Sequence, residues 1–472
     1  MHAGRTQRTR EERNRQGHPM TKTPSPPARR GPLLASCPQL LVRRRSGGRA
    51  IVFGRAGRGG QRRRCSVTRL KGILGLRSTQ LMTVGLLALL TGCEQQYVKT
   101  WGTGSDPATL TEIIELSEIP GRRLEEDPDI RIGEGEDAAL LFHRINDVSV
   151  REDGSLVVAD EGDFKLYIFT LTGDLHSEMG APGFGPGEFR RIAGAVPVGA
   201  DSLVVFDPAA LRLTSFDATG EVLETVRLEP PVGAQYALDT YHLADRDENG
   251  SVILIPRGRV VRAGPEPGVR RETQPVLRYA SDGELLGALE ARQELEIWDA
   301  EGVSMEVPHG DHRSVAVGSG RVVEVGHQTG RVRVWSRDGS MSEITLAVEQ
   351  RPMDASARDA WMASYTDRIE DRPQRQQAEA LLGQMPFPET APYVSDVRVG
   401  EDGAIWLAAA DLDLARTETT WIRIDDEGRA TGWVRVPASL RPHAIGDAQL
   451  IGIWTDSLGV QSVRRYRWDE GS

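Results

Sequence analysis

Short runs of alternating apolar and polar residues dominate the chain from residue 145 onward. Between residues 145 and 189 this pattern predicts four short strands, at 147–150, 156–159, 166–169 and from Asp174 onward. Turn residues separate the strands, and a glycine-rich stretch at 180–189 ends the unit. Four short strands in about 40 residues correspond to one blade of a β-propeller.

The same unit recurs along the chain. Its outer hairpin places an aromatic or aliphatic residue four positions before a turn glycine, in the pairs Phe169/Gly173, Phe216/Gly220, Tyr279/Gly283, Trp335/Gly339 and Ile424/Gly428. The inner hairpin at 147–158 matches 396–407 position by position, and looser copies lie at 196–206, 243–255 and 315–325. These repeats predict an all-β chain of similar blades.

Five blades are complete in the sequence, and a sixth begins at 442–454 and continues through 461–468. The sixth blade lacks a fourth strand, which a lone strand predicted at 111–118 would supply. That strand would close the ring and remove both free sheet edges. We therefore predict a six-bladed β-propeller over residues 111–470, with seven blades as the alternative.

Two recurring patterns resemble the NHL-repeat class of six-bladed β-propellers. They are the Asp-Gly-x-Leu/Ile-x-Val turn and strand, and the Gly-Phe-Gly-Pro-Gly-Glu-Phe ending at Phe189. The likeness is strongest in the first and fifth blades, whereas the third and fourth blades lack the glycine-rich ending. The resemblance implies fold more than activity, since the class includes scaffolds, receptors and a few lyases.

A helical insertion is predicted at residues 353–391. Trp361, Met362, Tyr365 and Ile369 have helical spacing, and Asp354 is a candidate N-cap. Pro373 is expected to break this helix, and a second short helix is expected to end at Gly383. We expect the apolar stripe to pack on the propeller rather than to bind a partner.

Residues 67–92 are typical of a lipoprotein signal peptide. Basic residues precede a short apolar core, which ends in Leu90, Thr91, Gly92 and Cys93. This ending resembles a bacterial lipobox, and Cys93 is the predicted lipid attachment site. An ordinary signal peptide is the alternative. Because Glu94 follows the cysteine, the resemblance favours the outer membrane, facing the periplasm or the cell surface, with residues 93–110 as a tether.

Charge divides the chain into two parts. Residues 1–92 hold 20 Lys and Arg against 2 Asp and Glu, so they carry a charge of +18. Because the net charge of the whole chain is −10, the remaining residues carry −28. An acidic body argues against nucleic acid as a partner. Residues 1–66 are predicted to be disordered, or else untranslated with a start nearer the signal, for example at Val67. Cys37, Cys65 and Cys93 all precede the body, so no disulfide framework is expected there.

Two patterns raise the question of a bound metal. Asp245, Asp247 and Asn249, followed by Gly250, have the spacing of the first ligands of a calcium loop. Pro256 stands where the bidentate glutamate of such a loop belongs, which favours an Asn-Gly turn over a Ca²⁺ site.

His242 and His312 each lie eight residues before a turn glycine. In a propeller their inner strands line the central channel, where two imidazoles could share Zn²⁺. Some NHL-like lyases hold zinc there, and ordinary loop histidines are the alternative.

Asp160, Asp163 and Asp207 follow the second strands of two blades and are candidate ligand-binding residues. The body contains no Gly-x-Ser-x-Gly, Walker or His-Glu-x-x-His motif. We therefore predict a monomeric ligand- or protein-binding platform with an unidentified partner, no required cofactor, and membrane contact through its lipid anchor alone. The alternative is a metal-dependent lyase or hydrolase with its site in the central channel.

Overall fold

The computed structural model describes residues 96–99, 112–115, 119–134, 140–199, 201–231, 238–247, 249–257, 266–337, 340–346, 351–353, 355–412, 416–426 and 428–469. The predicted basic segment, the signal peptide and Cys93 lie outside these residues, as do Gly339 and Asp354.

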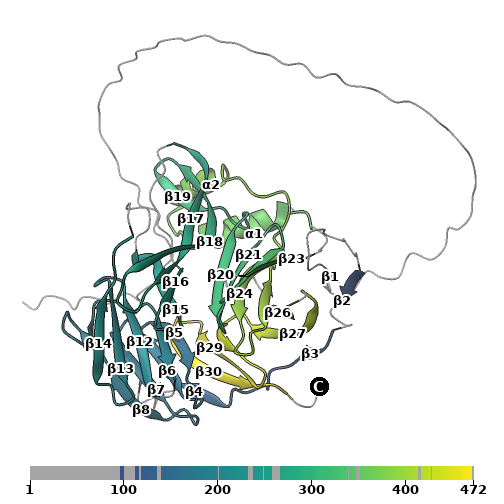
Figure 1. Ribbon diagram of the computed structural model, residues 1–472. Helices are drawn as coiled ribbons and strands as arrows, with labels where there is room; N and C mark the ends of the chain where they lie inside the picture. The colour runs from purple at the N-terminus through teal and green to yellow at the C-terminus, as the bar shows by residue number, and fades with distance from the viewer. Residues whose placement is uncertain are drawn as a thin grey trace, which may run out of the picture. The chain divides into compact units, whose positions relative to one another are not determined.

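Six units of four antiparallel strands form the body and correspond to the six predicted blades (Figure 1). Units 3 and 4 belong to one nine-stranded sheet, because β18 pairs with β20, and β3 (Gly121–Arg122) adds a parallel strand to the edge of the fifth unit. Blades 1 to 3 consist of β5 (Ile145–Val150), β6 (Leu156–Asp160), β7 (Lys165–Phe169) and β8 (Leu175–Met179); β11 (Ala195–Val198), β12 (Ser202–Asp207), β13 (Arg212–Asp217) and β14 (Val222–Arg227); and β15 (Tyr241–Arg246), β16 (Val252–Pro256), β17 (Gly268–Tyr279) and β18 (Leu285–Ala300). Blades 4 to 6 consist of β20 (Arg313–Gly318), β21 (Arg321–Gly326), β22 (Arg331–Ser336) and β23 (Met341–Thr345); β24 (Val394–Val399), β25 (Ile405–Ala409), β26 (Glu418–Ile424) and β27 (Ala430–Pro437); and β28 (Leu440–Ile445), β29 (Gln449–Thr455), β30 (Gln461–Arg467) and β4 (Ile130–Ile132).

The blades close into a ring. The first strand of each blade contacts the first strand of the next, from β5 through β11, β15, β20, β24 and β28 and back to β5. Between every two neighbouring blades lies a cluster of buried apolar side chains, which the alternating pattern supplies from facing sheets. The fold is therefore a six-bladed β-propeller, and its inner strands surround a central channel.

The strand that closes the ring differs from the prediction. The fourth strand of blade 6 is β4, in which Ile132 lies opposite Val463 and Ile130 opposite Arg465. A strand does form within the predicted range 111–118, but this strand, β2 (Glu112–Glu115), pairs with β1 (Gln96–Lys99) inside the predicted tether. β4 forms the closing strand because its residues Ile130 and Ile132 are both buried in the core between blades 6 and 1. Three residues suffice for this closure, and so short an alternation is hard to recognise in sequence.

The glycine-rich ending of blade 1 is a loop that folds over Glu188. Its carboxylate accepts hydrogen bonds from the backbone N–H groups of Phe184 and Gly185, at 2.9 and 2.8 Å. The flanking segments pair as β9 (Ala181–Pro182) and β10 (Glu188–Phe189). Phe189 is fully buried between blades 1 and 2. The motif therefore connects two blades and fixes their spacing.

Blade 3 carries an extension that the sequence did not reveal. Strands β17 and β18 continue past the blade, and β19 (Val303–Glu306) pairs with the end of β18. The predicted helices are present as α1 (Ala355–Thr366) and α2 (Arg372–Leu382), and they lie at the same end of the molecule as this extension (Figure 1). Trp361 of α1 packs with Trp298 and Met305 of the extension, and Met362 packs against the same cluster. Tyr365 of the predicted stripe is exposed, so the stripe is covered only in part. Pro373 lies in the first turn of α2, which Asp371 caps, and so it starts a helix as well as following one.

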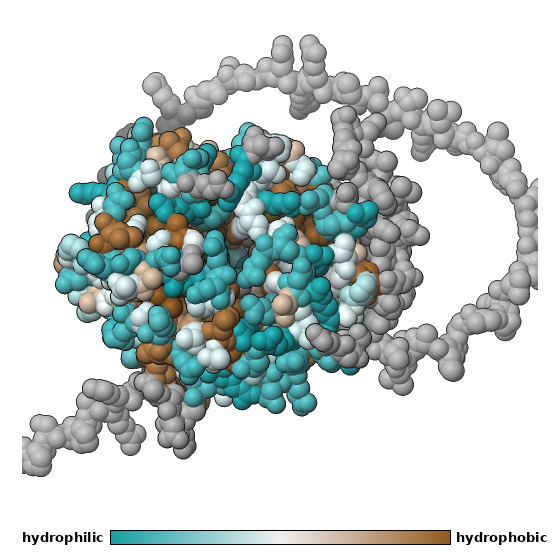
Figure 2. All heavy atoms as spheres, turned by 60° about the horizontal axis from the view of Figure 1, so that its bottom comes forward, coloured by the Kyte–Doolittle hydropathy of each residue, from teal (hydrophilic) through white to brown (hydrophobic). Residues whose placement is uncertain are grey.

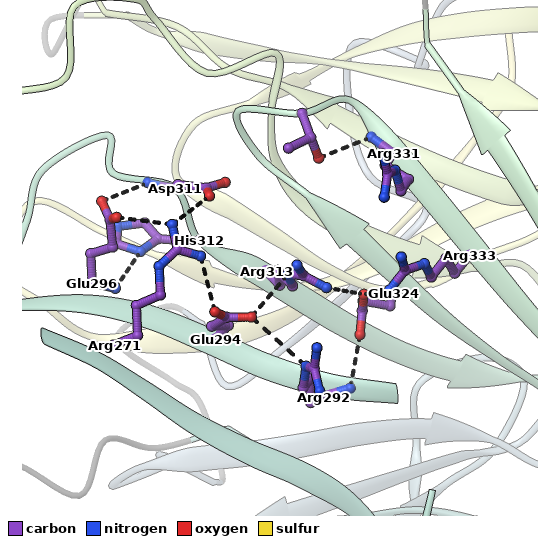
Figure 3. Close-up of polar contacts among 11 residues, drawn as sticks. Arg271, Arg292, Glu294, Glu296, Asp311, His312, Arg313, Glu324, Arg331 and Arg333 are labelled. Carbon is purple, nitrogen blue, oxygen red and sulfur yellow. Dashed lines mark hydrogen bonds and ion pairs between the residues drawn. The ribbon is translucent and has the colours of Figure 1, made fainter. Parts of the chain in front are cut away.

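Charged side chains form a network between blades 3 and 4 (Figure 3). Glu294 of β18 pairs with Arg271 and with Arg313 of β20, each at 3.0 Å. Glu324 of β21 accepts hydrogen bonds from Arg313 at 2.9 Å and from the backbone N–H of Arg292 at 3.0 Å. We call this network the seam. It joins the two blades where their apolar cluster holds four buried residues, Ile255, Val276, Ala291 and Val322.

Candidate functional site

The central channel contains a cavity of about 380 Å³, which the inner strands of all six blades line. This volume lies in the range of small-molecule pockets. Much of the wall is small or aliphatic, with Val148, Ala195, Leu243, Ala316 and Val317 among its residues. Polar side chains concentrate at one end.

That end is the face on which the inner strands begin. Because neighbouring strands are antiparallel, the second strand of each blade ends on this face. Seven residues of β5, β15, β24 and β28 and of the segment after β16 make up what we call the channel mouth: Asp147, His242, Arg257, Asp396, Arg398, Arg441 and His443.

A β-bulge shapes the inner strand in four blades. The pairing shifts by one residue in β5, β15, β24 and β28, and in β28 the extra residue is His443. An extra residue bends the strand and redirects a side chain. The bulge therefore turns His443 toward Asp147 of the neighbouring blade.

Asp147 is the central acceptor of the mouth. His242 Nε2 lies 3.3 Å from Oδ2 and His443 Nδ1 lies 3.4 Å from Oδ1. The backbone N–H groups of Val148 and Ala195 also donate to this carboxylate, each at 3.1 Å. Burial alone would raise the pKa of Asp147, but the two histidines outweigh it and hold the pKa well below its usual range.

The two histidines are uncharged at neutral pH. Burial lowers the pKa of His242, and it lowers the pKa of His443 to about 3. Each neutral imidazole then donates one N–H to the ionised Asp147. For His443 this leaves Nε2 as an acceptor. Nε2 is buried, and in the described part of the chain it has no hydrogen-bond partner.

The three arginines of the mouth differ in their contacts. Arg398 donates to Asp396 at 2.8 Å and to the carbonyl of Pro442 at 3.1 Å. Arg257 lines the cavity and Arg441 is exposed beside it, and among the described residues neither guanidinium makes a hydrogen bond or ion pair. Burial within the surrounding protein, together with Arg398, lowers the pKa of Arg257 to about 10. With both histidines neutral, three arginines face two carboxylates, and the mouth is electropositive.

The predicted acidic residues lie on the same face, but their oxygens serve the loops. Asp160 is fully buried and accepts from the backbone N–H groups of His143, Arg144 and Gly162. Asp207 does the same in blade 2, with three backbone donors. Asp163 accepts from the hydroxyl of Tyr167 at 2.7 Å. These contacts account for the carboxylates without a ligand.

The structure does not bring His242 and His312 together. His242 lies at Asp147, whereas His312 accepts from the backbone N–H of Glu296 at 3.1 Å and contacts the carbonyl of Val307 at 2.8 Å. The described residues contain no group of three or more His, Cys, Asp or Glu side chains arranged for a metal. The two histidines therefore do not fit a shared Zn²⁺ site.

The turn at Asp245, Asp247 and Asn249 is also satisfied internally. Asp247 Oδ1 accepts from the backbone N–H groups of Asn249 and Ser251, both at 2.9 Å, and Oδ2 accepts from Arg278 at 2.7 Å. Gly250 has a φ of +82°, which a side chain would disfavour. The segment is the predicted β-turn between β15 and β16, and its donor set does not fit Ca²⁺.

Comparison with known proteins supports the architecture. A family model described as "6-bladed beta-propeller" matches residues 136–249. No curated protein matches the sequence. Among solved structures, a member of the DUF4221 family from Bacteroides vulgatus is 11% identical with a TM-score of 0.47, over 74% of this chain and 98% of that one.

Two further solved structures match with lower TM-scores. Virginiamycin B lyase from Staphylococcus aureus is 14% identical with a TM-score of 0.33, over 69% of this chain and 84% of that one. BamB from Moraxella catarrhalis is 10% identical with a TM-score of 0.29, over 68% and 71%.

Sequence reasoning missed most of the mouth. Arg257, Arg398 and Arg441 were not singled out, although Asp147 and Asp396 occupy matching positions in the two best repeats. That match was the available signal, because equivalent positions of inner strands face the same channel. The sequence does not show which arginines lack partners, because this depends on contacts between residues of different blades.

Proposed function

We propose that this chain is a lipid-anchored, extracytoplasmic six-bladed propeller that binds a small polar ligand at its channel mouth. The observation that carries the proposal is a pair of arginines: Arg257, which lines the cavity, and Arg441, which lies close enough to Asp147 and Asp396 to interact with both electrostatically. In the described structure neither guanidinium makes a hydrogen bond or an ion pair. This cavity combines small aliphatic residues with a few convergent polar groups, and such a combination is the usual form of a small-molecule site.

The ring provides a rigid support for this site. Six of the seven mouth residues sit on inner strands whose backbones are paired within each blade and packed between blades, and Arg257 directly follows β16. Asp147 holds His443 in one orientation, and Asp396 does the same for Arg398. A ligand would therefore meet groups that are already in place, so little ordering opposes binding.

A protein partner is the less favoured occupant. The face in Figure 2 is mostly hydrophilic, and its apolar residues lie in separate patches. The large exposed apolar residues Leu141, Phe184 and Leu458 lie in three separate loops, before β5, after β8 and between β29 and β30. Protein interfaces generally need a contiguous, well-packed core, which this face does not present.

The lipid anchor is supported by the sequence around Cys93 alone. Among the described residues, no helix is long and apolar enough to cross a membrane. We expect a chain expressed in a Gram-negative host to incorporate radiolabelled palmitate and to fractionate with the outer membrane. A Cys93→Ala variant should incorporate none. Equal labelling of the two chains would contradict the anchor.

Ligand binding can be tested without knowing the ligand. The full chain, purified in detergent, is incubated with a small-molecule extract of the host envelope and filtered, and the retained molecules are identified by mass spectrometry. Ala244→Trp should fill the channel and abolish retention. Ala438→Trp, at an exposed position after β27, is the matched control and should retain what the wild type retains. Identical retention by all three chains would refute a channel site.

One observation favours an enzyme as the second candidate. Asp147 contacts Nδ1 of His443, a residue that lines the cavity, and Nε2 of the same ring is left without a partner in the described structure, as in a positioned general base. A pKa of about 3 makes this imidazole a weak proton acceptor at neutral pH, so binding is favoured over catalysis. Dependence of thermal stability on a chelator would support the metal-dependent form of this candidate, and no dependence would remove its support.

A further inference from the structure

The arginines and His443 together restrict the chemistry of the ligand, and this inference rests on the proposed channel site. Arg257 lies immediately after β16 in blade 3, and Arg441 is the second residue of β28 in blade 6. Asp147 of blade 1 comes between them in the order of blades around the ring. Both side chains are exposed; Arg257 lines the cavity, and Arg441 interacts electrostatically with Asp147 and Asp396 at the mouth, so a ligand can reach them. Guanidinium groups bind carboxylate and phosphate oxygens through paired N–H donors.

The carboxylates nearby do not neutralise these two arginines. Asp147 already accepts four hydrogen bonds, two from imidazoles and two from the backbone. Asp396 accepts from Arg398 and from the backbone N–H of Val397, both at 2.8 Å. The surplus positive charge therefore remains available to an anionic group on the ligand.

His443 adds a second and independent requirement. Its side chain is 3% exposed, and Nε2 has no hydrogen-bond partner among the described residues. Because Asp147 takes the proton on Nδ1, Nε2 can accept but not donate. A buried acceptor without a donor is costly, so a fitting ligand carries a hydroxyl or amine group toward it.

The rest of the wall limits size and polarity. Ala195, Ala244, Ala316 and Val317 offer small aliphatic surfaces, and the cavity of about 380 Å³ suits a molecule of about monosaccharide size. A compact ring or chain would pack on these residues while its polar groups face the mouth.

We propose that the channel mouth binds a hydroxylated oxyanion of monosaccharide size. Arg257 and Arg441 hold its acidic group, and a neighbouring hydroxyl donates to Nε2 of His443. The acidic group is a carboxylate, as in a sugar acid, or a phosphate, as in a sugar phosphate. Both present the oxygen pairs that arginine recognises, and the experiment below separates them.

The test is calorimetric titration of the full chain in detergent with four probes. Glucuronate and glucose 6-phosphate carry both required groups, glucose lacks the anion, and cyclohexanecarboxylate lacks the hydroxyls. We expect one or both sugar anions to bind at least tenfold more tightly than glucose and than cyclohexanecarboxylate. If glucuronate binds more tightly, the acidic group of the ligand is a carboxylate; if glucose 6-phosphate binds more tightly, it is a phosphate.

Variants assign the binding to the named side chains. Arg257→Gln and Arg441→Gln should each weaken sugar-anion binding about tenfold to a hundredfold, the range for losing a charged hydrogen bond. Arg227→Gln, on the exposed outer strand of blade 2, is the matched control and should bind like the wild type. His443→Leu should remove the preference for glucuronate over cyclohexanecarboxylate. Thermal unfolding of each variant verifies that it is folded.

Several results would overturn the inference. These are equal affinity for glucose and the sugar anions, affinities that Arg257→Gln and Arg441→Gln leave unchanged, and no binding of any probe. Glucose binding that Ala244→Trp abolishes would refute the anionic class and leave the channel site standing. If no probe binds, the extract experiment is used instead. Retention of a molecule by the wild type but not by Ala244→Trp would then show that the channel site exists although the anionic class is wrong. Loss of that retention difference would refute the channel site itself.

Discussion

Arginines meet carboxylates in two regions of this propeller, with different outcomes. In the seam between blades 3 and 4, Arg313 bridges Glu294 and Glu324, so each charge has a partner within the chain. At the channel mouth the carboxylates are occupied by other groups, and neither Arg257 nor Arg441 makes a hydrogen bond or ion pair in the described structure. Paired charges hold blades together, whereas unpaired charges oppose stability and are expected where a ligand binds.

The largest expected effect is on the seam. Glu324→Gln should lower the free energy of unfolding by about 3 kcal/mol, because Arg313 and the backbone N–H of Arg292 lose a buried ionised acceptor. Glu343→Gln is the matched control. Its side chain is 35% exposed, so removing its pairs with Arg331 and Arg333 should change stability by less than about 1 kcal/mol. Denaturant unfolding measures both, and equal losses would show that the seam is not a structural network.

Acid should destabilise both regions through their buried histidines. Burial lowers the pKa of His443 to about 3 and that of His327, which contacts Ser314 near the seam, to about 4. In the unfolded chain these histidines have their usual pKa, near 6.5. Below that pH the unfolded chain therefore binds more protons than the folded chain. The stability that each neutral histidine contributes is therefore present above pH 6.5 and is lost as pH falls.

For His443 this loss amounts to about 3 kcal/mol between pH 6.5 and pH 4. His443→Gln should flatten the dependence of unfolding free energy on pH over that window. His327→Gln should flatten it down to about pH 4 and leave the further fall toward pH 3 in place. Parallel curves for the wild type and both variants would contradict the burial of neutral imidazoles.

The smallest expected effect on stability comes from comparing a paired arginine of the seam with an unpaired arginine of the channel mouth. Arg313→Gln should lower the free energy of unfolding by about 2 kcal/mol, because two carboxylates lose their partner. Arg441→Gln should leave it unchanged or raise it by up to about 1 kcal/mol, since the substitution relieves repulsion from Arg398. A similar loss in both variants would show that Arg441 is structural.

The parts of the fold that could be predicted were those written in local patterns. Alternation and turn glycines identified five blades, and helical spacing identified α1, because these depend on neighbours in sequence. The closing strand was misplaced, since β4 holds its place through Ile130 and Ile132 packing on residues more than 300 positions away. The extension of β17 and β18 was missed because its length depends on contacts with α1 and α2.

The candidate site was less accessible to sequence reasoning. His242 could be placed near the channel, but the bulge that turns His443 toward Asp147 has no local signature. The predicted acidic residues Asp160 and Asp207 are on the expected face, yet backbone donors in their own loops occupy them. Conversely, an arginine shows its lack of a partner only after the blades are assembled around it.

The most direct test of the central claim is a crystal structure of the full chain soaked with glucuronate and with glucose 6-phosphate. Our account predicts density for a sugar anion in the channel mouth, with its acidic group between Arg257 and Arg441 and a hydroxyl at Nε2 of His443. Density at another surface, or an acidic group that points away from both arginines, would contradict it.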